Sequence, residues 1–253
     1  LALLASIVLS NLGGAREGAR ISNALSFQAQ THSLLGSDLV GWWNFNDPDA
    51  RYKDLSGEGN GGSCATSCPV PVDGVPGTGG TAMEFNGSDS GIALSKGIDA
   101  FEGDFTVSVW VRFNDDSRAI ILGTYNEGAD QVNFEKHTGN RLRIWWDGSP
   151  DVLTPNDAVR TGEWHLVTFS RRGNNFLFHV DGVQFHSYTG SLTSRDPAGT
   201  WRIGRDSRTG TTVTDGSIDD LRVYSRALSS FEISELYASG MNGRVSELHK
   251  EGD

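Results

Sequence analysis

Between residues 82 and 224 the sequence is a succession of short segments in which apolar and polar residues alternate. Such alternation places successive side chains on opposite faces of a β-strand. Two-residue turns such as Gly173-Asn174 and Asp181-Gly182 separate some of these segments and are typical of antiparallel hairpins. The expected strands are AMEF, GIAL, FTVSVWVRF, AIILGTY, QVNFEKH, RLRIWW, WHLVTFSRR, NFLFHVDG, VQFHSY, TWRIG and SIDDLRVY. With no long helical pattern between them, they predict an antiparallel β-sandwich or jelly roll.

Residues 1–35 have a different composition and predict one long helix. Its first part, LALLASIVLSNL, is apolar on every side, and after Gly13-Gly14 the pattern becomes amphipathic. A helix that is apolar all round is buried in protein or in lipid. Twelve such residues are too few to cross a bilayer, which needs about 20. Because the chain starts on Leu1, we expect further residues upstream of it.

The passage LLASIVLSNLGGAREGAR, followed by ISNAL, resembles the second half of the N-terminal helix of type IV pilins. The cleavage site and the acidic residue of that family would lie before Leu1. The resemblance implies that this helix packs with copies of itself at the centre of a filament. The implied packing positions are Leu1, Leu4, Ala5, Ile7, Val8, Leu12, Gly13 and Gly14. An ordinary membrane anchor and a helix buried against the β-domain are the alternatives, and the small residues favour close helix packing.

A second resemblance covers residues 39 to about 238. The ordered motifs GWWNFND, DLSGEGNGG, AMEFNGSDSGIAL, FTVSVWVRF, GEWHLVTFS, FLFHVDGV, WRIG and DGSIDDLRVYSRALSSFEISELY look like a laminin G-like, concanavalin A-like jelly roll. In the last motif, Ser229-Ser230 and Glu232 predict the start of a short helix. We expect that helix to dock on the sandwich through Phe231, Ile233, Leu236 and Tyr237.

The predicted fold class is therefore mainly β, with a long N-terminal helix followed by an antiparallel β-sandwich. The expected domains are a helix over residues 1–36, a jelly roll over 37–240 and a C-terminal tail over 241–253. The net charge of -11 argues against nucleic acid and anionic lipid headgroups as partners of the globular part.

The two cysteines, Cys64 and Cys68, lie four positions apart in the loop-like sequence CATSCP. A metal site would need further ligands, and no second Cys pair and no nearby His supplies them. We therefore expect a disulfide that closes a very short loop. Such a bridge is typical of an oxidising compartment, which agrees with an extracellular location.

The sequence does not predict an enzyme. A retaining glycosidase needs two carboxyl groups about 5 Å apart, whereas Asp219 and Asp220 are adjacent on a predicted strand and point to opposite faces. The six histidines show no spacing suited to a metal triad.

Calcium is the one cofactor that the sequence suggests. Oxygen ligands for this ion are offered by Asp54 and Asn60 in DLSGEGNGG and by Asp219 in GSIDDL. The jelly-roll resemblance implies that these segments lie together and that an ion joins the early loop to the last strand. The alternative is that Asp54 and Asn60 only hydrogen-bond their own turns.

Carbohydrate binding is suggested by Trp145 and Trp146, which are adjacent in a predicted strand and precede Asp147. One of the two indoles must face away from the core or be covered by another element, and an exposed indole would be a sugar platform. A place in the core or in a subunit contact is the alternative. Trp110, Trp164 and Trp201 are flanked by aliphatic residues and are expected in the core.

Two classes of function follow from these features. In the first, the chain is the structural subunit of a type IV pilus-like surface filament, a helical homopolymer whose lectin-like outer domain serves adhesion. Before assembly such a subunit would be held in the inner membrane. In the second, the chain is a monomeric, membrane-anchored carbohydrate-binding adhesin. A minor pseudopilin of a secretion or DNA-uptake system is a third possibility that shares the helix.

Overall fold

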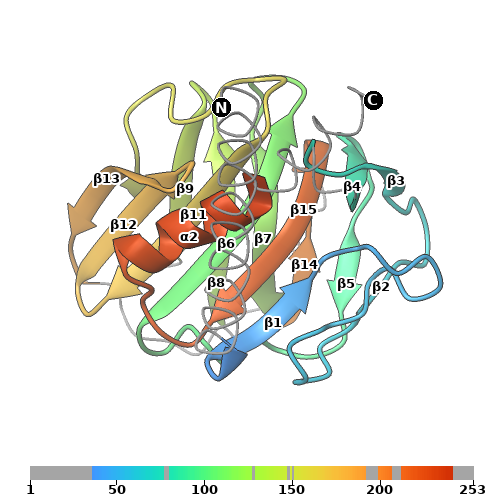
Figure 1. Cartoon of the computed structure of the whole chain (residues 1–253), viewed down its shortest axis with the longest axis horizontal. Coiled ribbons are helices and arrows are strands. Elements are labelled where there is room, and N and C mark those ends of the chain that lie inside the picture. Colours follow the sequence, from blue (N-terminus) through green and yellow to red (C-terminus); the bar gives the residue numbers. More distant parts are fainter. Residues whose placement is uncertain are drawn as a thin grey trace, which may run out of the picture. The chain divides into compact units, whose positions relative to one another are not determined.

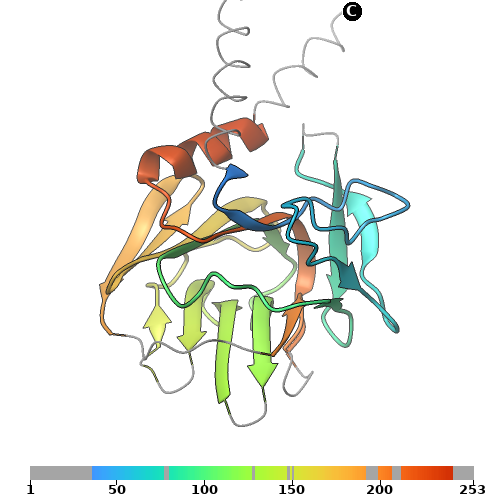
Figure 2. The same cartoon turned by 90° about the horizontal axis from the view of Figure 1, so that it is seen from below.

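The computed structural model describes residues 36–76, 80–126, 129–146, 149, 151–191, 199–206 and 212–241. The chain divides into two compact units, Leu1–Ser37 and Asp38–Asp253. The second unit consists of two antiparallel β-sheets packed face to face (Figures 1 and 2).

The first sheet has eight strands and is called sheet A here. Its order is β13, β12, β11, β6, β15, β4, β3, and β1 pairs with β15 beside this path. Neighbouring strands are antiparallel. The strands are β1 (Leu39–Trp43), β3 (Val70–Asp73), β4 (Thr81–Asn86), β6 (Phe105–Phe113), β11 (His165–Arg172), β12 (Asn175–Val180), β13 (Val183–Thr189) and β15 (Asp215–Tyr224).

The second sheet, sheet B, has seven strands in the order β10, β9, β8, β7, β14, β5, β2. Its neighbouring strands are also antiparallel. The strands are β2 (Gly62–Ser63), β5 (Ile92–Leu94), β7 (Ala119–Asn126), β8 (Ala129–His137), β9 (Arg141–Trp146), β10 (Val152–Leu153) and β14 (Thr200–Ile203).

The hydrophobic core lies between the two sheets. Every second residue of a strand points into it. In β6 the residues Val107, Val109, Val111 and Phe113 belong to this core. The residues between them point to the outer face of sheet A. Aromatic rings from both sheets meet in the core, where Phe105 of sheet A lies 5.7 Å from Phe134 of sheet B, centroid to centroid.

Helix α2 (Ser230–Met241) crosses the outer face of sheet A (Figure 2). It begins with a capping box, because Ser229 N–H donates to Glu232 Oε2 (2.7 Å) and Glu232 N–H donates to Ser229 Oγ (3.3 Å). Ile233 and Leu236 are buried beneath it. Phe231 was expected to dock as well, but its side chain is 61% exposed, so that expectation is wrong.

Trp110 occupies an unexpected place. It is 3% exposed, yet it lies on the outer face of sheet A and outside the core between the sheets. Its indole stacks on the Tyr237 ring of α2 at a centroid distance of 5.6 Å and an interplanar angle of 28°. Gly240 completes this contact, because an added Cβ would lie 2.7 Å from the Trp110 ring. The prediction of a core position is corrected to a position beneath the helix.

The predicted fold class also needs correction. The jelly-roll β-sandwich fits, but the part of the chain that the structure describes contains a short helix on the C-terminal side and no long helix before β1. Residues 1–35, which carry the predicted helix and the filament positions from Leu1 to Gly14, lie outside the described residues. No described helix is both long enough and apolar enough to span a membrane.

Candidate functional site

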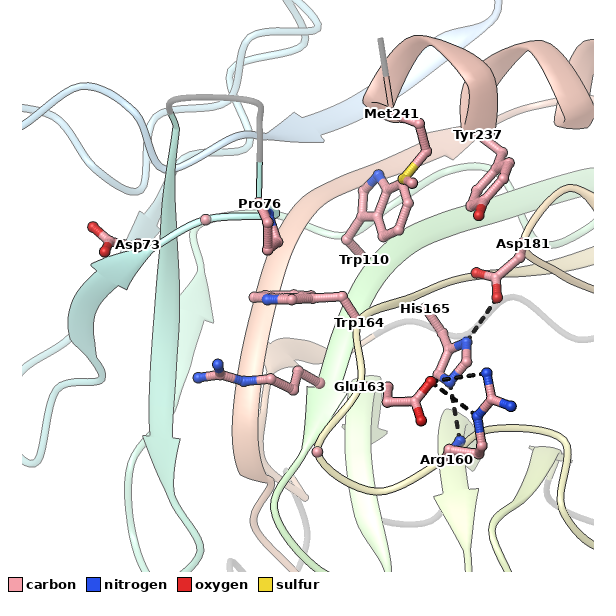
Figure 3. A pocket seen from close by; sticks show the side chains of 13 residues that line it. Asp73, Pro76, Trp110, Arg160, Glu163, Trp164, His165, Asp181, Tyr237 and Met241 are labelled. Carbon is pink, nitrogen blue, oxygen red and sulfur yellow. Dashed lines mark hydrogen bonds and ion pairs between the residues drawn. The ribbon is translucent and has the colours of Figure 1, made fainter. Parts of the chain in front are cut away.

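A cavity of about 520 Å³ opens on the outer face of sheet A beside the C-terminal end of α2 (Figure 3). It is formed by β6, by the turn before β11, by the turn between β12 and β13, and by the end of β3. We call it the Trp164 cavity. Its lining residues are Asp73, Gly74, Pro76, Trp110, Arg112, Arg160, Gly162, Glu163, Trp164, His165, Asp181, Tyr237 and Met241.

Trp164 forms an aromatic wall of this cavity. It directly precedes β11 and is half-buried. The guanidinium carbon of Arg112 lies 5.5 Å from the centroid of the Trp164 ring, a cation–π distance. Arg112 is in turn held by a hydrogen bond from its Nη2 to Ser217 Oγ (3.2 Å). The indole is therefore fixed by its neighbours before any ligand arrives.

His165 and Asp181 form a dyad at the back of the cavity (Figure 3). His165 Nδ1 lies 2.8 Å from Asp181 Oδ2, and Arg160 N–H donates to His165 Nε2 (3.1 Å). Because Nε2 accepts a hydrogen bond, Nδ1 carries the proton and the imidazole is neutral. Both ring nitrogens are occupied, so His165 holds the loop in place and has no free nitrogen for a substrate.

The turn that carries Asp181 has the geometry that its sequence predicts. Asp181 and Gly182 both have positive φ, +53° and +79°, as an Asp-Gly hairpin of type I′ requires. Asp181 Oδ1 also accepts a hydrogen bond from Leu166 N–H (3.0 Å). Helix α2 lies close over this turn, since a Cβ on Gly182 would be 3.1 Å from Tyr237 Cβ.

Charged groups surround the mouth of the cavity. Arg160 pairs with Glu163 at 2.8 Å, and both side chains are more than half exposed. Asp73 is exposed, and its carboxylate has no ion-pair partner among the described residues. No Ser, Thr or Cys occurs among the described residues that line the cavity. The lining thus offers an aromatic surface with hydrogen-bonding groups, among them the carboxylates of Asp73, Glu163 and Asp181.

Comparison with known proteins identifies the family. A family model described as the concanavalin A-like lectin/glucanases superfamily matches residues 86–234. The chain belongs to this superfamily. Comparison with curated protein sequences finds no match.

Several solved structures share the fold of this domain. Domain 4 of AbnA, an extracellular arabinanase from Geobacillus stearothermophilus solved with arabinotriose, has a TM-score of 0.65 and 20% identity, over 79% of this chain and 98% of that one. The binding domain of botulinum neurotoxin serotype D has a TM-score of 0.64 and 14% identity, over 83% of this chain and 53% of that one. Trypanosoma rangeli sialidase in complex with sialic acid has a TM-score of 0.60 and 17% identity, over 80% of this chain and 33% of that one.

The predicted sugar platform is only partly on the surface of this lectin-like domain. Trp146 is 1% exposed and lies in the core, so its prediction as a glycan-binding residue is wrong. Trp145 lies on the outer face of sheet B, away from the core, and is half-buried opposite Asn133. Asp147 lies outside the described residues. The two sugar-site candidates on described residues are therefore Trp145 and the cavity at Trp164.

Trp164 itself was predicted to be a core residue, and that prediction is wrong. It precedes the first residue of β11, so strand alternation does not govern its direction. The one available signal was the preceding GE turn sequence, which places Trp164 at a loop end. Trp201, by contrast, is fully buried and stacks on Phe101 at 4.8 Å.

Asp54 and Asn60, two of the predicted calcium ligands, are engaged in hydrogen bonds within and beside their loop. The Asp54 carboxylate accepts from the N–H groups of Trp42, Ser56 and Asn60 at 2.9 to 3.0 Å. Burial opposes ionisation of Asp54, but these hydrogen bonds outweigh it and lower its pKa. The Asn60 amide joins the next loop, accepting from Lys96 N–H (3.0 Å) and donating to Gly97 O (3.2 Å).

Asp219, the third predicted ligand, lies opposite Trp110 in the pairing of β15 with β6. It lines a separate cavity of about 150 Å³ and accepts a long hydrogen bond from Val75 N–H (3.4 Å). Burial, together with the neighbouring Asp220, raises the pKa of Asp219 to about 7. Among the described residues, no three His, Cys, Asp or Glu side chains are grouped to hold a metal ion. A calcium site with Asp54, Asn60 and Asp219 stays a prediction.

The structure contains the disulfide between Cys64 and Cys68, with a Cα–Cα distance of 5.5 Å. It lies in the connection between β2 and β3. No free cysteine remains.

Proposed function

We propose that this jelly roll is a non-catalytic carbohydrate-binding domain and that the Trp164 cavity is its binding site. The observation that carries the proposal is the half-buried indole of Trp164, fixed by Arg112 at 5.5 Å in the wall of an open cavity. A flat aromatic face packs against the C–H groups of a sugar ring, and a few polar side chains then orient the hydroxyl groups. Arg160, Glu163 and Asp73 supply such polar groups here.

The absence of catalysis is part of the proposal. The general base that a hydrolase would need is not offered by His165, because Arg160 N–H and Asp181 occupy both of its nitrogens. Glu163 is engaged with Arg160, whose Nε and Nη2 both approach Glu163 Oε2, at 2.9 Å and 2.8 Å. Asp73 is left as a single carboxylate without an ion-pair partner in the described lining, whereas a glycosidase needs a pair of carboxyl groups. These contacts support a site that holds a glycan without cleaving it.

The relatives suggest which sugars to try first. Domain 4 of the arabinanase was solved with arabinotriose, and it matches this chain over nearly its own full length. We therefore include arabinotriose among the first ligands. An extracellular location remains part of the proposal and is supported by the Cys64–Cys68 disulfide.

The filament subunit predicted from residues 1–35 is not carried into this proposal. That prediction rests on residues outside the described part of the chain. The matches reported above are to a domain of an arabinanase, to a sialidase and to a toxin binding domain, and none of these is a pilin.

The test is a glycan array probed with the full chain, followed by calorimetric titration of arabinotriose and of the strongest hits. Two matched variants separate the candidate sites, Trp164→Ala for the cavity and Trp145→Ala for the face of sheet B. We expect Trp164→Ala to weaken binding at least tenfold and Trp145→Ala to leave it unchanged. The reverse pattern would move the site to sheet B, and the lack of any glycan ligand would contradict the function.

A further inference from the structure

We infer that the Trp164 cavity selects neutral glycans and discriminates against glycans that carry a carboxylate, such as sialic and uronic acids. This inference rests on the proposed function and adds the class of ligand.

The charges that line the cavity do not balance. Asp73, Glu163 and Asp181 contribute three carboxylates, whereas Arg112 and Arg160 contribute two guanidinium groups. His165 adds no positive charge, because its Nε2 accepts the hydrogen bond from Arg160 N–H. The described lining therefore carries one unbalanced negative charge.

Arg160 is already engaged in an ion pair, and Arg112 already has contacts at its guanidinium face and at one nitrogen. Arg160 directs both Nε and Nη2 at Glu163. Arg112 lies over the Trp164 ring and donates Nη2 to Ser217 Oγ. A ligand carboxylate would have to displace Glu163 to pair in a bidentate way with the Nε and Nη2 of Arg160. The Nε of Arg112 has no hydrogen-bond partner, but it is buried. A neutral sugar hydroxyl requires no such exchange.

Asp73 is the group that leaves the balance negative. It lies at the rim of the cavity on the end of β3, and its carboxylate has no ion-pair partner among the described residues. The rest of the protein reinforces its effect, since the net charge of the chain is -11. Both the local and the overall field therefore repel an anionic ligand as it approaches.

Pairs of glycans that differ by an acidic group test this inference on the full chain. Lactose is compared with 3′-sialyllactose, and galactobiose with digalacturonate, together with any neutral and acidic counterparts that an array identifies. We expect the neutral member to bind about tenfold more tightly at low ionic strength, the size of a single unscreened charge contact near a surface. This difference in affinity should shrink in 0.5 M NaCl, where the screening length is roughly 4 Å.

Two charge variants locate the effect. Asp73→Asn removes the carboxylate at the rim, and Asp49→Asn removes an exposed carboxylate that does not line the cavity. Both change the net charge equally. We expect Asp73→Asn to narrow the difference between neutral and acidic ligands several-fold and Asp49→Asn to leave it nearly unchanged.

The possible failures are distinguishable. Equal or tighter binding of the acidic members would overturn the selectivity and leave the carbohydrate-binding function standing. An equal effect of the two charge variants would overturn the role of the cavity charge in selectivity. Absence of binding to every neutral and acidic glycan would overturn the function and this inference together.

Discussion

At the scale of single residues, Trp110 is a buried side chain that lies outside the core, and it should contribute strongly to the free energy of unfolding. Its indole is enclosed between the outer face of sheet A and α2, where it stacks on Tyr237. Trp110→Ala should therefore lower the free energy of unfolding by about 3 to 5 kcal/mol, as loss of a buried indole does. Urea unfolding followed by circular dichroism measures the change.

The matched control for Trp110 is Tyr237→Phe, which keeps the stacked ring and removes only the hydroxyl group. Tyr237→Phe should lower the free energy of unfolding much less than Trp110→Ala does. Wild-type unfolding of Trp110→Ala would contradict the placement of this indole beneath α2.

Asp219 gives a pH dependence whose sign follows from its raised pKa. Burial raises the pKa of Asp219 to about 7 in the folded protein, against an ordinary value of 3.8 for an aspartate side chain. The folded state then binds the proton more tightly than the unfolded state, so the contribution of this group is fully present below about pH 4 and is lost as the pH rises through 7. The wild type should lose stability between pH 5 and pH 8 relative to Asp219→Asn. Parallel pH profiles of the two proteins, measured by urea unfolding, would exclude this role.

The contribution of His179 to stability has the opposite pH dependence to that of Asp219. Burial lowers the pKa of His179 to about 4, and its Nε2 lies 3.2 Å from Ser230 Oγ at the start of α2. Its contribution is present above about pH 6.5 and is lost as the pH falls towards 4. His179→Gln should therefore flatten the stability profile on the acidic side while Asp219→Asn flattens it near neutrality. Urea titrations of both variants across pH 4 to 8 check this separation.

The sequence predicts side-chain direction well inside strands and poorly at their ends. Alternation requires that one of Trp145 and Trp146 face outward, and it is Trp145 that does so. No such rule applies to Trp164, which precedes β11 and whose exposure depends on where α2 and the neighbouring turns lie. The candidate site therefore could not be predicted, because it is assembled from segments far apart in sequence.

At the scale of elements, the start of α2 combines a capping box with an ion-pair cluster. Arg226 pairs with both Glu232 (2.6 Å) and Asp38 (2.7 Å), which ties the helix to the residue before β1. The hydrogen bond from Arg226 lowers the pKa of Glu232 to about 2, against the opposing effect of burial. Glu232 therefore stabilises the fold above about pH 4.5 and ceases to do so as the pH falls through 2.

Glu232→Gln keeps the capping-box acceptor, since Gln also serves at this position, and removes the charge that pairs with Arg226. It should destabilise α2 by about 0.5 to 1 kcal/mol, the size of a partly exposed ion pair. Hydrogen exchange of the α2 amides should accelerate, while exchange in β8 and β9 stays unchanged. Glu235→Gln is the matched control, because Glu235 lies in the same helix and has no ion-pair partner among the described residues. Equal acceleration by the two substitutions would show that the ion pair of Glu232 with Arg226 contributes nothing specific.

The elements that the sequence missed are the shortest ones. The sequence predicts no strand between residues 46 and 80, yet this interval contains β2 and β3. These strands form by pairing with β5 and β4. Two to four residues carry too little alternation to be recognised alone, so such strands become visible only through their partners. The longer strands, from β6 to β9 and in β11, β12 and β15, follow their sequence patterns.

At the scale of the whole molecule, the disulfide should matter little to global stability. It joins residues only four positions apart, and closure of so short a loop is worth about 2 kcal/mol or less in the chain-entropy model. The double variant Cys64→Ser, Cys68→Ser should show a small loss in urea unfolding and faster hydrogen exchange in the connection between β2 and β3. The intact mass of the wild-type protein, measured with and without reductant, should differ by two hydrogens.

The predicted structural calcium ion would also act on the whole molecule. An ion bound only by the folded state raises the melting temperature with ion concentration. A higher melting temperature in calcium than in chelator is the expected result. An unchanged melting temperature would leave Asp54 and Asn60 with the hydrogen-bonding roles described above.

The position of β15 has a consequence for how the protein folds during its synthesis. This strand lies between β6 on one side and β4 and β1 on the other, although those strands come far earlier in the chain. At about 5 to 20 residues per second, a ribosome needs several seconds to proceed from β6 to β15. Until then the two parts of sheet A have no strand to join them, and their apolar faces stay open to the cytosol or the translocation channel. We therefore expect the nascent chain to depend on chaperones until its last strand emerges, with β15 then closing the sheet in a single late step.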